Sequence, residues 1–139
     1  MNLVDQLLKA DVKKADEFES GVFHSKKLAK ILGKKEAVEV TIREIGSRRV
    51  NDIVAYQVDK KGNFDFSKTY DAKLLMVIEG VVDPDLRNKD LQKYFGCDNA
   101  KDLAEKLFGS EINELSDAIS ALSGIISDTT EDTEEEIKN

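Results

Sequence analysis

The densest group of potential metal ligands lies in VVDPDLRNKDLQKYFG, residues 81 to 96. A calcium loop of the EF-hand type needs oxygen ligands at alternating positions, a glycine at the sixth position and a glutamate at the twelfth. Counted from Asp83, Arg87 occupies a ligand position, Asn88 the glycine position and Tyr94 the glutamate position. The sequence therefore predicts no metal site in this stretch.

The same stretch is better explained as a joint between two helices. The residue before a proline avoids helical geometry, so Asp83-Pro84 is expected to end the preceding apolar helix. Asn88 can cap the next helix, on which Leu91 and Phe95 are spaced to face inward. We therefore interpret these residues as structural.

His24 and Cys97 are the other residues whose side chains could take part in catalysis. A histidine base needs a nucleophile and an orienting acid beside it in space, which the sequence alone does not establish. Because Ser25 is expected to cap a helix, we interpret His24 as a surface residue. A helix N-terminus can activate a thiolate, and Cys97 precedes a helix, but a partly buried structural cysteine is the favoured interpretation.

No other pattern indicates an enzyme. The carboxylates of Glu111 and Glu114 are expected to face solvent on a helix. GKKEAV and KKGNF have neither the spacing nor the lysine-serine end of a phosphate-binding P-loop. The sequence therefore predicts a protein that is not an enzyme, with no metal, no cofactor and no catalytic residue.

The composition bounds the class of protein. The chain has 139 residues, of which 40% are apolar and 35% charged, which suits one domain with a modest core. No run of about 18 apolar residues occurs, so no membrane span is expected. A single cysteine excludes an internal disulfide, and we expect a cytoplasmic location.

Charge and apolar periodicity divide the chain into three parts. Residues 1 to 21 are expected to form a short helix over residues 2 to 9 and then a linker. Residues 22 to 127 are expected to form a single domain. Residues 128 to 139, DTTEDTEEEIKN, have no apolar pattern and are expected to be a disordered acidic tail.

The first part of the domain combines a helix and a strand. Residues 23 to 33 predict a helix with Leu28, Ile31 and Leu32 on one face. Residues 37 to 45, AVEVTIREI, alternate apolar and polar side chains, which predicts a half-buried strand.

The rest of the domain is predicted to be helical. Ser47 and Ser110 are expected to cap helices, as is Asn99. The segment from 67 to 81 is the most apolar helix, and we expect it to be the centre of the core. Three short helices follow, each ended by a glycine. The apolar positions of the central helix are Tyr70, Leu74, Leu75, Val77, Ile78 and Val81.

The predicted fold class is therefore α+β and mainly α. It is a small helical domain with one or two short strands and a disordered acidic C-terminal tail. The helices after residue 84 are about ten residues each, too short to be stable alone, so they must pack against the apolar helix before them.

An ordered set of segments resembles the XkdN-like family of phage tail assembly chaperones. These segments are IEGVVDPD at residues 78 to 85, LRNKDLQKYFG at 86 to 96, NAKDLAEKLF at 99 to 108 and SEINELSDAISALSG at 110 to 124. The upstream SKKLAKILG, followed by a strand, is also similar to the opening of the family. The longer, more charged segment GKKEAVEV departs from the family pattern and leaves the boundary of the first strand open.

The resemblance implies a non-enzymatic protein that acts during assembly of a phage tail or a phage-tail-like particle. Such chaperones hold the tape-measure protein, recruit tail-tube subunits to it and are absent from the mature tail. The implied partners are therefore the tape-measure protein and the tail-tube protein, in the cytoplasm of the bacterial host.

Nucleic-acid binding is the alternative function. Residues 22 to 62 contain ten Lys or Arg against five Asp or Glu, and they could form a patch that neutralises phosphates. Aromatic residues are not interleaved with these charges, as single-strand binders prefer. The simpler interpretation is that these lysines form a solvated surface that binds no nucleic acid.

The acidic tail carries six acids against one lysine and supplies the candidate partner-binding residues. It could contact the tail-tube subunit, or it could cover the basic face of its own domain, and a solubilising role is favoured. The candidate residues are Glu131, Asp132, Glu134, Glu135 and Glu136.

Overall fold

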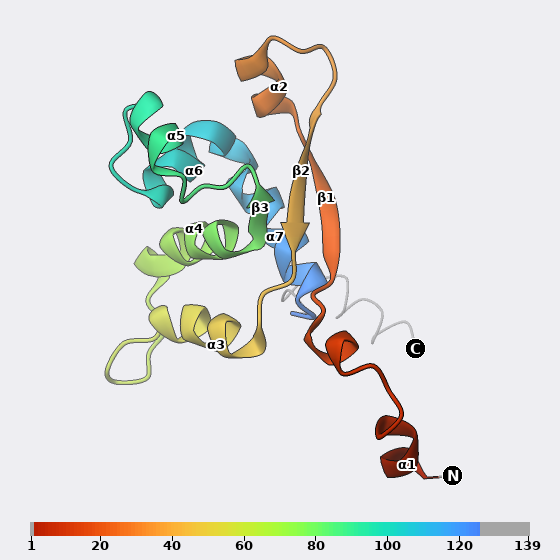
Figure 1. Cartoon of the computed structure of the whole chain (residues 1–139). Coiled ribbons are helices and arrows are strands. Elements are labelled where there is room, and N and C mark those ends of the chain that lie inside the picture. The colour runs from red at the N-terminus through yellow and green to blue at the C-terminus, as the bar shows by residue number, and fades with distance from the viewer. Residues whose placement is uncertain (1, 126–139) are drawn as a thin grey trace, which may run out of the picture.

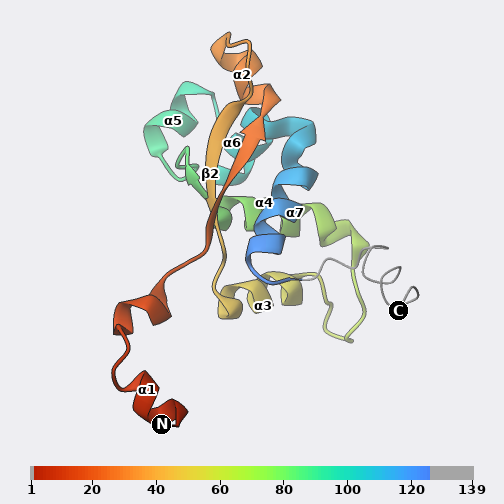
Figure 2. The same cartoon turned by 90° about the vertical axis from the view of Figure 1, so that its right-hand side faces the viewer.

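The structure is a computed structural model that describes residues 2 to 125, and it consists of a small sheet packed against a group of helices, with one face of the sheet left open (Figures 1 and 2). This content confirms the predicted mainly helical α+β class. The strands are β1 (Ser20–Ser25), β2 (Val38–Arg43) and β3 (Val81–Asp83). The helices are α1 (Leu3–Leu7), α2 (Lys26–Leu32), α3 (Ser47–Tyr56), α4 (Thr69–Gly80), α5 (Lys89–Tyr94), α6 (Ala100–Phe108) and α7 (Ile112–Leu122). The 3₁₀ turns are η1 (Val12–Asp16), η2 (Phe66–Lys68) and η3 (Gly109–Glu111).

The sheet is antiparallel, with β2 between β1 and β3. Ser25 at the end of β1 lies opposite Val38, and Val81 of β3 lies opposite Ile42. Along β2 the side chains of Val40 and Ile42 are buried while the residue between them is exposed. The alternation predicted for this strand is therefore confirmed.

β1 was not predicted, and it begins inside the stretch expected to be a linker. Its sequence, SGVFHS, shows no alternation of apolar and polar side chains, because Val22 and Phe23 are adjacent, although burial alternates along the folded strand. The strand is defined instead by its backbone pairing with β2, which is a contact between distant residues. Its presence raises the number of strands among residues 2 to 125 to three.

β3 also corrects the predicted end of the central helix. The helix ends at Gly80, and three strand residues follow before Pro84. Val81 is buried and pairs with β2, so the chain leaves the helix before the proline could end it. Asp83 and Pro84 follow the strand directly, and their peptide bond is cis.

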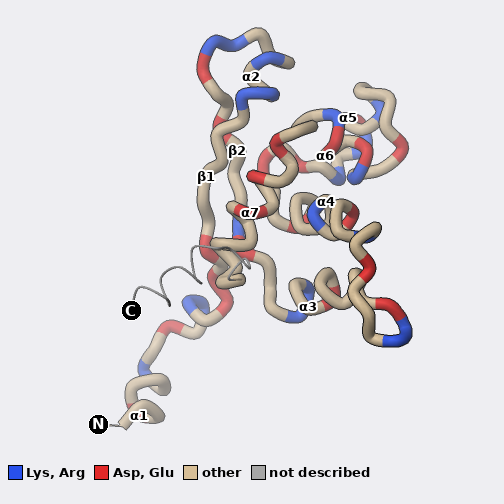
Figure 3. The backbone as a smooth tube through the Cα atoms, turned by 180° about the vertical axis from the view of Figure 1, so that it is seen from behind, with Lys and Arg blue, Asp and Glu red and all other residues tan. Residues whose placement is uncertain are grey.

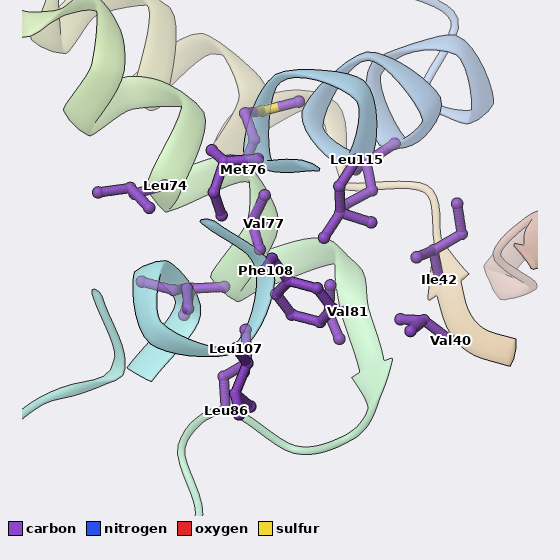
Figure 4. Packing of buried hydrophobic residues seen from close by; sticks show 14 of the residues in the cluster. Val40, Ile42, Leu74, Met76, Val77, Val81, Leu86, Leu107, Phe108 and Leu115 are labelled. Carbon is purple, nitrogen blue, oxygen red and sulfur yellow. The ribbon is translucent and has the colours of Figure 1, made fainter. Parts of the chain in front are cut away.

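α4 is the centre of the hydrophobic core, as predicted. It contacts α3, α6 and α7 and leads directly into β3. Its Leu74, Met76 and Val77 side chains are all buried, although they point to different sides of the helix. Figure 4 shows them in one cluster with Phe108 of α6 and Leu115 of α7. Burying these surfaces is the main favourable contribution to folding.

Three of the five predicted helix caps are confirmed. The side-chain oxygens of Ser25, Asn88 and Asn99 each accept a hydrogen bond from the amide three residues later. The predictions for Ser47 and Ser110 were wrong. The cap of α3 is Gly46, without a side-chain bond, and Ser110 lies inside the turn η3.

A close approach between α4 and α7 generates the first prediction. A Cβ atom added at Gly80 would lie 2.5 Å from Cγ2 of Ile119, whose side chain is buried and has no room to move aside. We expect Gly80→Ala to lower the free energy of unfolding by about 1–3 kcal/mol, because overpacking forces neighbouring side chains out of position. Urea denaturation of the full chain measures this change.

Gly46→Ala is the matched control, because a Cβ at Gly46 would meet no atom within 4 Å. Because Gly46 is the N-cap of α3, where alanine is less favourable than glycine, its substitution should cost no more than about 1 kcal/mol. Gly80→Ala combined with Ile119→Ala, which removes all three atoms that the new Cβ would meet, should cost less than the sum of the two single substitutions. Equal unfolding midpoints for Gly80→Ala and Gly46→Ala would contradict the packing described here.

Candidate partner-binding groove and N-terminal arm

An apolar groove lies between α2, β2, α5 and α6. Its volume is about 260 Å³, and its only charged lining residues are Glu39 and Asp83. Apolar side chains from α2, from α5 and the residue after it, and from α6 line this groove. The other lining residues are Leu28, Ile31, Leu32, Val38, Pro84, Leu91, Phe95 and Leu107.

α2 forms the more exposed wall. The sequence placed Leu28, Ile31 and Leu32 on one face of this helix, and all three line the groove. Only Leu28 is buried, whereas Ile31 is 39% and Leu32 57% exposed. The helix therefore packs on α6 through its beginning and presents apolar side chains to solvent at its end, where Gly33 stops it.

A carboxylate from the distant η3 turn fixes the beginning of α2. Glu111 Oε1 accepts a hydrogen bond from Ser25 Oγ at 2.6 Å, and Oε2 accepts from the Lys26 and Lys27 amides at 2.9 and 3.4 Å. Ser25 Oγ in turn accepts from the Leu28 amide at 3.0 Å. Three amides at the start of the helix are thereby satisfied, and a negative charge there is favourable.

This contact corrects the expectation that Glu111 and Glu114 both face solvent. Glu114 is exposed on α7, but Glu111 is partly buried against α2. Sequence reasoning missed the role because the residues that meet are separated by 86 positions. Only the fold brings them together.

α5 forms the opposite wall, and its position depends on the segment first considered as a metal loop. Asn88 caps the helix, and the buried Gln92 donates from Nε2 to the Leu86 carbonyl at 2.9 Å. Leu91 and Phe95 are half-buried and line the groove, so the expectation that they face inward is confirmed. The segment is a joint, as predicted, and its residues also line one side of the groove.

The N-terminal arm, residues 2 to 19, is the second apolar surface. Both Figure 1 and Figure 2 show α1 and η1 extending away from the rest of the fold. No residue of α1 is buried, and Leu7 and Leu8 are 69% and 80% exposed. A helix of five residues is not stable alone in water, so this apolar face needs a partner.

The last residues of the arm are attached at the Arg43 end of the sheet, far from the groove. The guanidinium of Arg43 lies 4.6 Å from the centre of the Phe18 ring. The Glu44 amide donates to the Glu19 carbonyl at 2.7 Å, and the Glu19 amide donates to Glu44 Oε1 at 2.7 Å. The arm therefore leaves from the Arg43 end of β2, whereas the groove lies at the Val38 end.

The two residues considered for catalysis lie in different elements and do not contact one another. His24 is exposed on β1, with Nε2 4.0 Å from Glu39 Oε1. Cys97 is partly buried between α5 and α6, where Sγ donates to the Phe95 carbonyl at 3.7 Å. Both positions agree with the structural interpretations that the sequence favoured.

Two perturbed pKa values lie outside the groove. Hydrogen bonds from Ser67 lower the pKa of the Asp65 carboxyl, and partial burial, reinforced by the charge of Glu105, raises the pKa of the Tyr70 phenol. Over residues 2 to 125, no three His, Cys, Asp or Glu side chains are grouped so as to hold a metal ion. None of the described helices is long and apolar enough to cross a membrane.

The basic residues between 22 and 62 do not form one surface. Figure 3 shows one concentration of blue at α2 and the loop after it, and a second at the loop after α3, at the opposite end of the fold. Arg49, between them, pairs with Glu79 at 3.0 Å. This division weakens the case for a phosphate-binding patch, which needs neighbouring cations.

The predicted partner-binding residues of the tail, Glu131, Asp132, Glu134, Glu135 and Glu136, lie outside the residues that the structure describes. The groove and the arm, in contrast, were missed as sites. The apolar side chains of α1 and α2 can be read from the sequence, but that no other element covers them is a property of the fold.

Comparison with known proteins gives one family and one related fold. The sequence matches the family of phage XkdN-like tail assembly chaperone proteins over residues 4–138. The crystal structure of the protein YqbN has a TM-score of 0.55 and 13% identity, over 78% of this chain and 88% of that chain. At that identity the likeness establishes the fold alone. No protein of curated function gives a significant match.

The match over nearly the whole chain places it among the tail assembly chaperones of phages. Within this class, the chain belongs to the XkdN-like family, which is the family that its helical segments resemble.

The contact between Glu111 and α2 generates the second prediction. Glu111→Gln keeps the shape of the side chain but removes the charge from the helix N-terminus. Because hydrogen bonds to charged groups contribute roughly 1.5–3 kcal/mol, we expect a loss of unfolding free energy of about that size or somewhat less. Urea denaturation monitored by circular dichroism measures it.

Glu114→Gln is the control, since Glu114 is exposed one turn further along the chain. It should leave the unfolding midpoint unchanged. In addition, Glu111→Gln should speed amide hydrogen exchange at Leu28 and the residues after it. Unchanged exchange in α2 would rule out this anchoring role.

Proposed function

We propose that the chain holds the tape-measure protein while a phage tail is assembled, recruits tail-tube subunits to it and is absent from the mature tail. The observation that carries this proposal is the unpartnered apolar groove on a member of a tail assembly chaperone family. The chain acts by binding and not by catalysis, in the cytoplasm of the bacterial host.

The groove suits an amphipathic helix. Such helices dock by inserting apolar side chains, spaced three or four residues apart, between two walls. Leu32 of α2 and Phe95, which directly follows α5, line the groove. The volume of 260 Å³ is below the roughly 300–1,000 Å³ of small-molecule sites, so it favours a few side chains of a partner over an enclosed ligand.

The resemblance to the family implies what the partner helix belongs to. A tape-measure protein is long, helical and apolar along one side, so it needs a soluble partner until the tube covers it. A short groove gives a modest interface, which allows the chaperone to dissociate when the tube subunits arrive.

The arm provides the second contact that a recruiting protein needs. Its apolar residues lie at the opposite end of the sheet from the groove, so both surfaces can be occupied at once. We assign the groove to the tape-measure protein and the arm to the tail-tube subunit.

The third prediction tests the groove. In the double variant Ile31→Glu, Leu32→Glu, two exposed apolar side chains become charged. Each buried Ile or Leu contributes roughly 1.5–3 kcal/mol, so losing two should lower the affinity for the tape-measure protein by at least about a hundredfold. The measurement is the soluble fraction of co-expressed tape-measure protein, followed by titration of the purified proteins.

Val54→Glu is the matched control, because Val54 is 48% exposed on α3 and does not line the groove. It should keep the tape-measure protein soluble. Equal solubility with both variants would overturn the assignment of the groove. Recovery of the chain in stoichiometric amounts from purified mature tails would overturn the chaperone role itself.

The fourth prediction tests the arm. Leu7→Asp combined with Leu8→Asp should abolish co-purification of the tail-tube subunit and leave the tape-measure protein bound. These side chains are exposed, so thermal unfolding should not change. Loss of the tape-measure protein with retention of the tube subunit would show that the two assignments are reversed.

A further inference from the structure

The groove lies beside a concentration of unpaired positive charge. Residues 26 to 35, KKLAKILGKK, contain five lysines and no acid. None of these lysines forms an ion pair with another residue between 2 and 125, and four are exposed. We call them the lysine surface, and they are Lys26, Lys27, Lys30, Lys34 and Lys35.

Three of the four arginines have partners among the described residues. Arg49 and Arg87 both bind Glu79, at 3.0 and 2.9 Å, and Arg43 covers the ring of Phe18. The lysine surface differs from these arginines because none of its side chains has an ion-pair partner among the described residues. It has about as many positive charges as the acidic tail has negative ones. Residues 128 to 136 contain six acids and no base.

The position where the described chain ends allows the two to meet. Ile125 follows α7, whose neighbouring Ser123 Oγ accepts from the Ile45 amide at 2.9 Å, just after β2. From there to the lysine surface the tail must cover the length of β2, about 20 Å for six residues at roughly 3.3 Å each. An extended chain reaches Glu131 at about 20 Å and Glu136 at about 36 Å from Ile125.

We propose that the acidic tail is the resident occupant of this surface, with residues 131 to 136 on the lysine surface and Ile137 beside Leu32 at the end of the groove. The order of charges fits this placement. Lys138 follows Ile137, and the two charged residues that line the groove, Glu39 and Asp83, are both acidic.

The acidic tail is expected to bind the lysine surface weakly and reversibly, because the contacts are exposed ion pairs within one chain. Exposed ion pairs contribute roughly 0.2–1 kcal/mol each, and they weaken as salt screens them. Attachment through a short linker supplies an effective concentration in the millimolar range. The tail therefore covers the surface at low salt and leaves it readily, which a partner for the groove requires.

Carbodiimide cross-linking of the native full-length chain, which joins a carboxylate directly to a contacting lysine, tests the proposal without any substitution. Lys60 and Lys61 are the internal control, because they are also a pair of adjacent exposed lysines, on the loop after α3. At low salt, links from residues 131 to 136 to the lysine surface should exceed links to the control pair by about five- to thirtyfold. At 1 M salt this preference should disappear.

Mixing ¹⁴N- and ¹⁵N-labelled chains before the reaction separates links within one chain from links between chains. Links within one chain support the proposal, and links that are mostly between copies overturn it. Equal yields at the two pairs of lysines, or a preference that is unchanged in 1 M salt, also overturn it.

Lys34→Gln with Lys35→Gln should reduce the yield at the remaining lysines of the surface, whereas Lys60→Gln with Lys61→Gln should not. A tape-measure helix that enters the groove would have to displace the tail, and this consequence rests on the proposed function. The cross-linking contains no partner, so its failure and the failure of the chaperone assignment are distinguishable.

Discussion

The burial of α4 on nearly every side is the constraint on which the rest of this fold depends. A helix with no polar face cannot lie at the surface, so other elements must cover it. α3, α6 and α7 do so, and β2 extends the same core through Val40 and Ile42. Because the covering helices are too short to persist alone, they and α4 stabilise one another.

The groove and the arm are the apolar surfaces that this core leaves uncovered. α2 packs through Leu28 and Ala29, but the apolar side chains at its end have nothing to cover. No residue of α1 is buried. Exposed apolar side chains of this kind are typical of sites of protein interaction. Here they lie on elements that are attached to the rest of the fold by specific contacts. Glu111 anchors α2, and Phe18 with Glu19 anchors the arm.

Separation of the two surfaces suits a protein that brings others together. The groove and the arm lie at opposite ends of β2, so the strand sets their spacing. Charge adds selectivity to apolar contact, because the lysine surface borders the groove while the arm carries both signs. The unequal distribution of charge therefore distinguishes two otherwise similar apolar sites.

The sequence by itself determined the local structure and the class of protein. Apolar periodicity predicted α4 as the core and β2 as a strand, side-chain caps predicted the starts of α2, α5 and α6, and the order of the helical segments pointed to the family. Only the tertiary structure decided what depends on distant residues. β1 exists because β2 is there to pair with it, and Glu111 meets Ser25 because η3 leads into α7, which packs against β1 and β2. The groove likewise is a property of four separate elements, and periodicity reports which residues share a face but not whether another element covers that face.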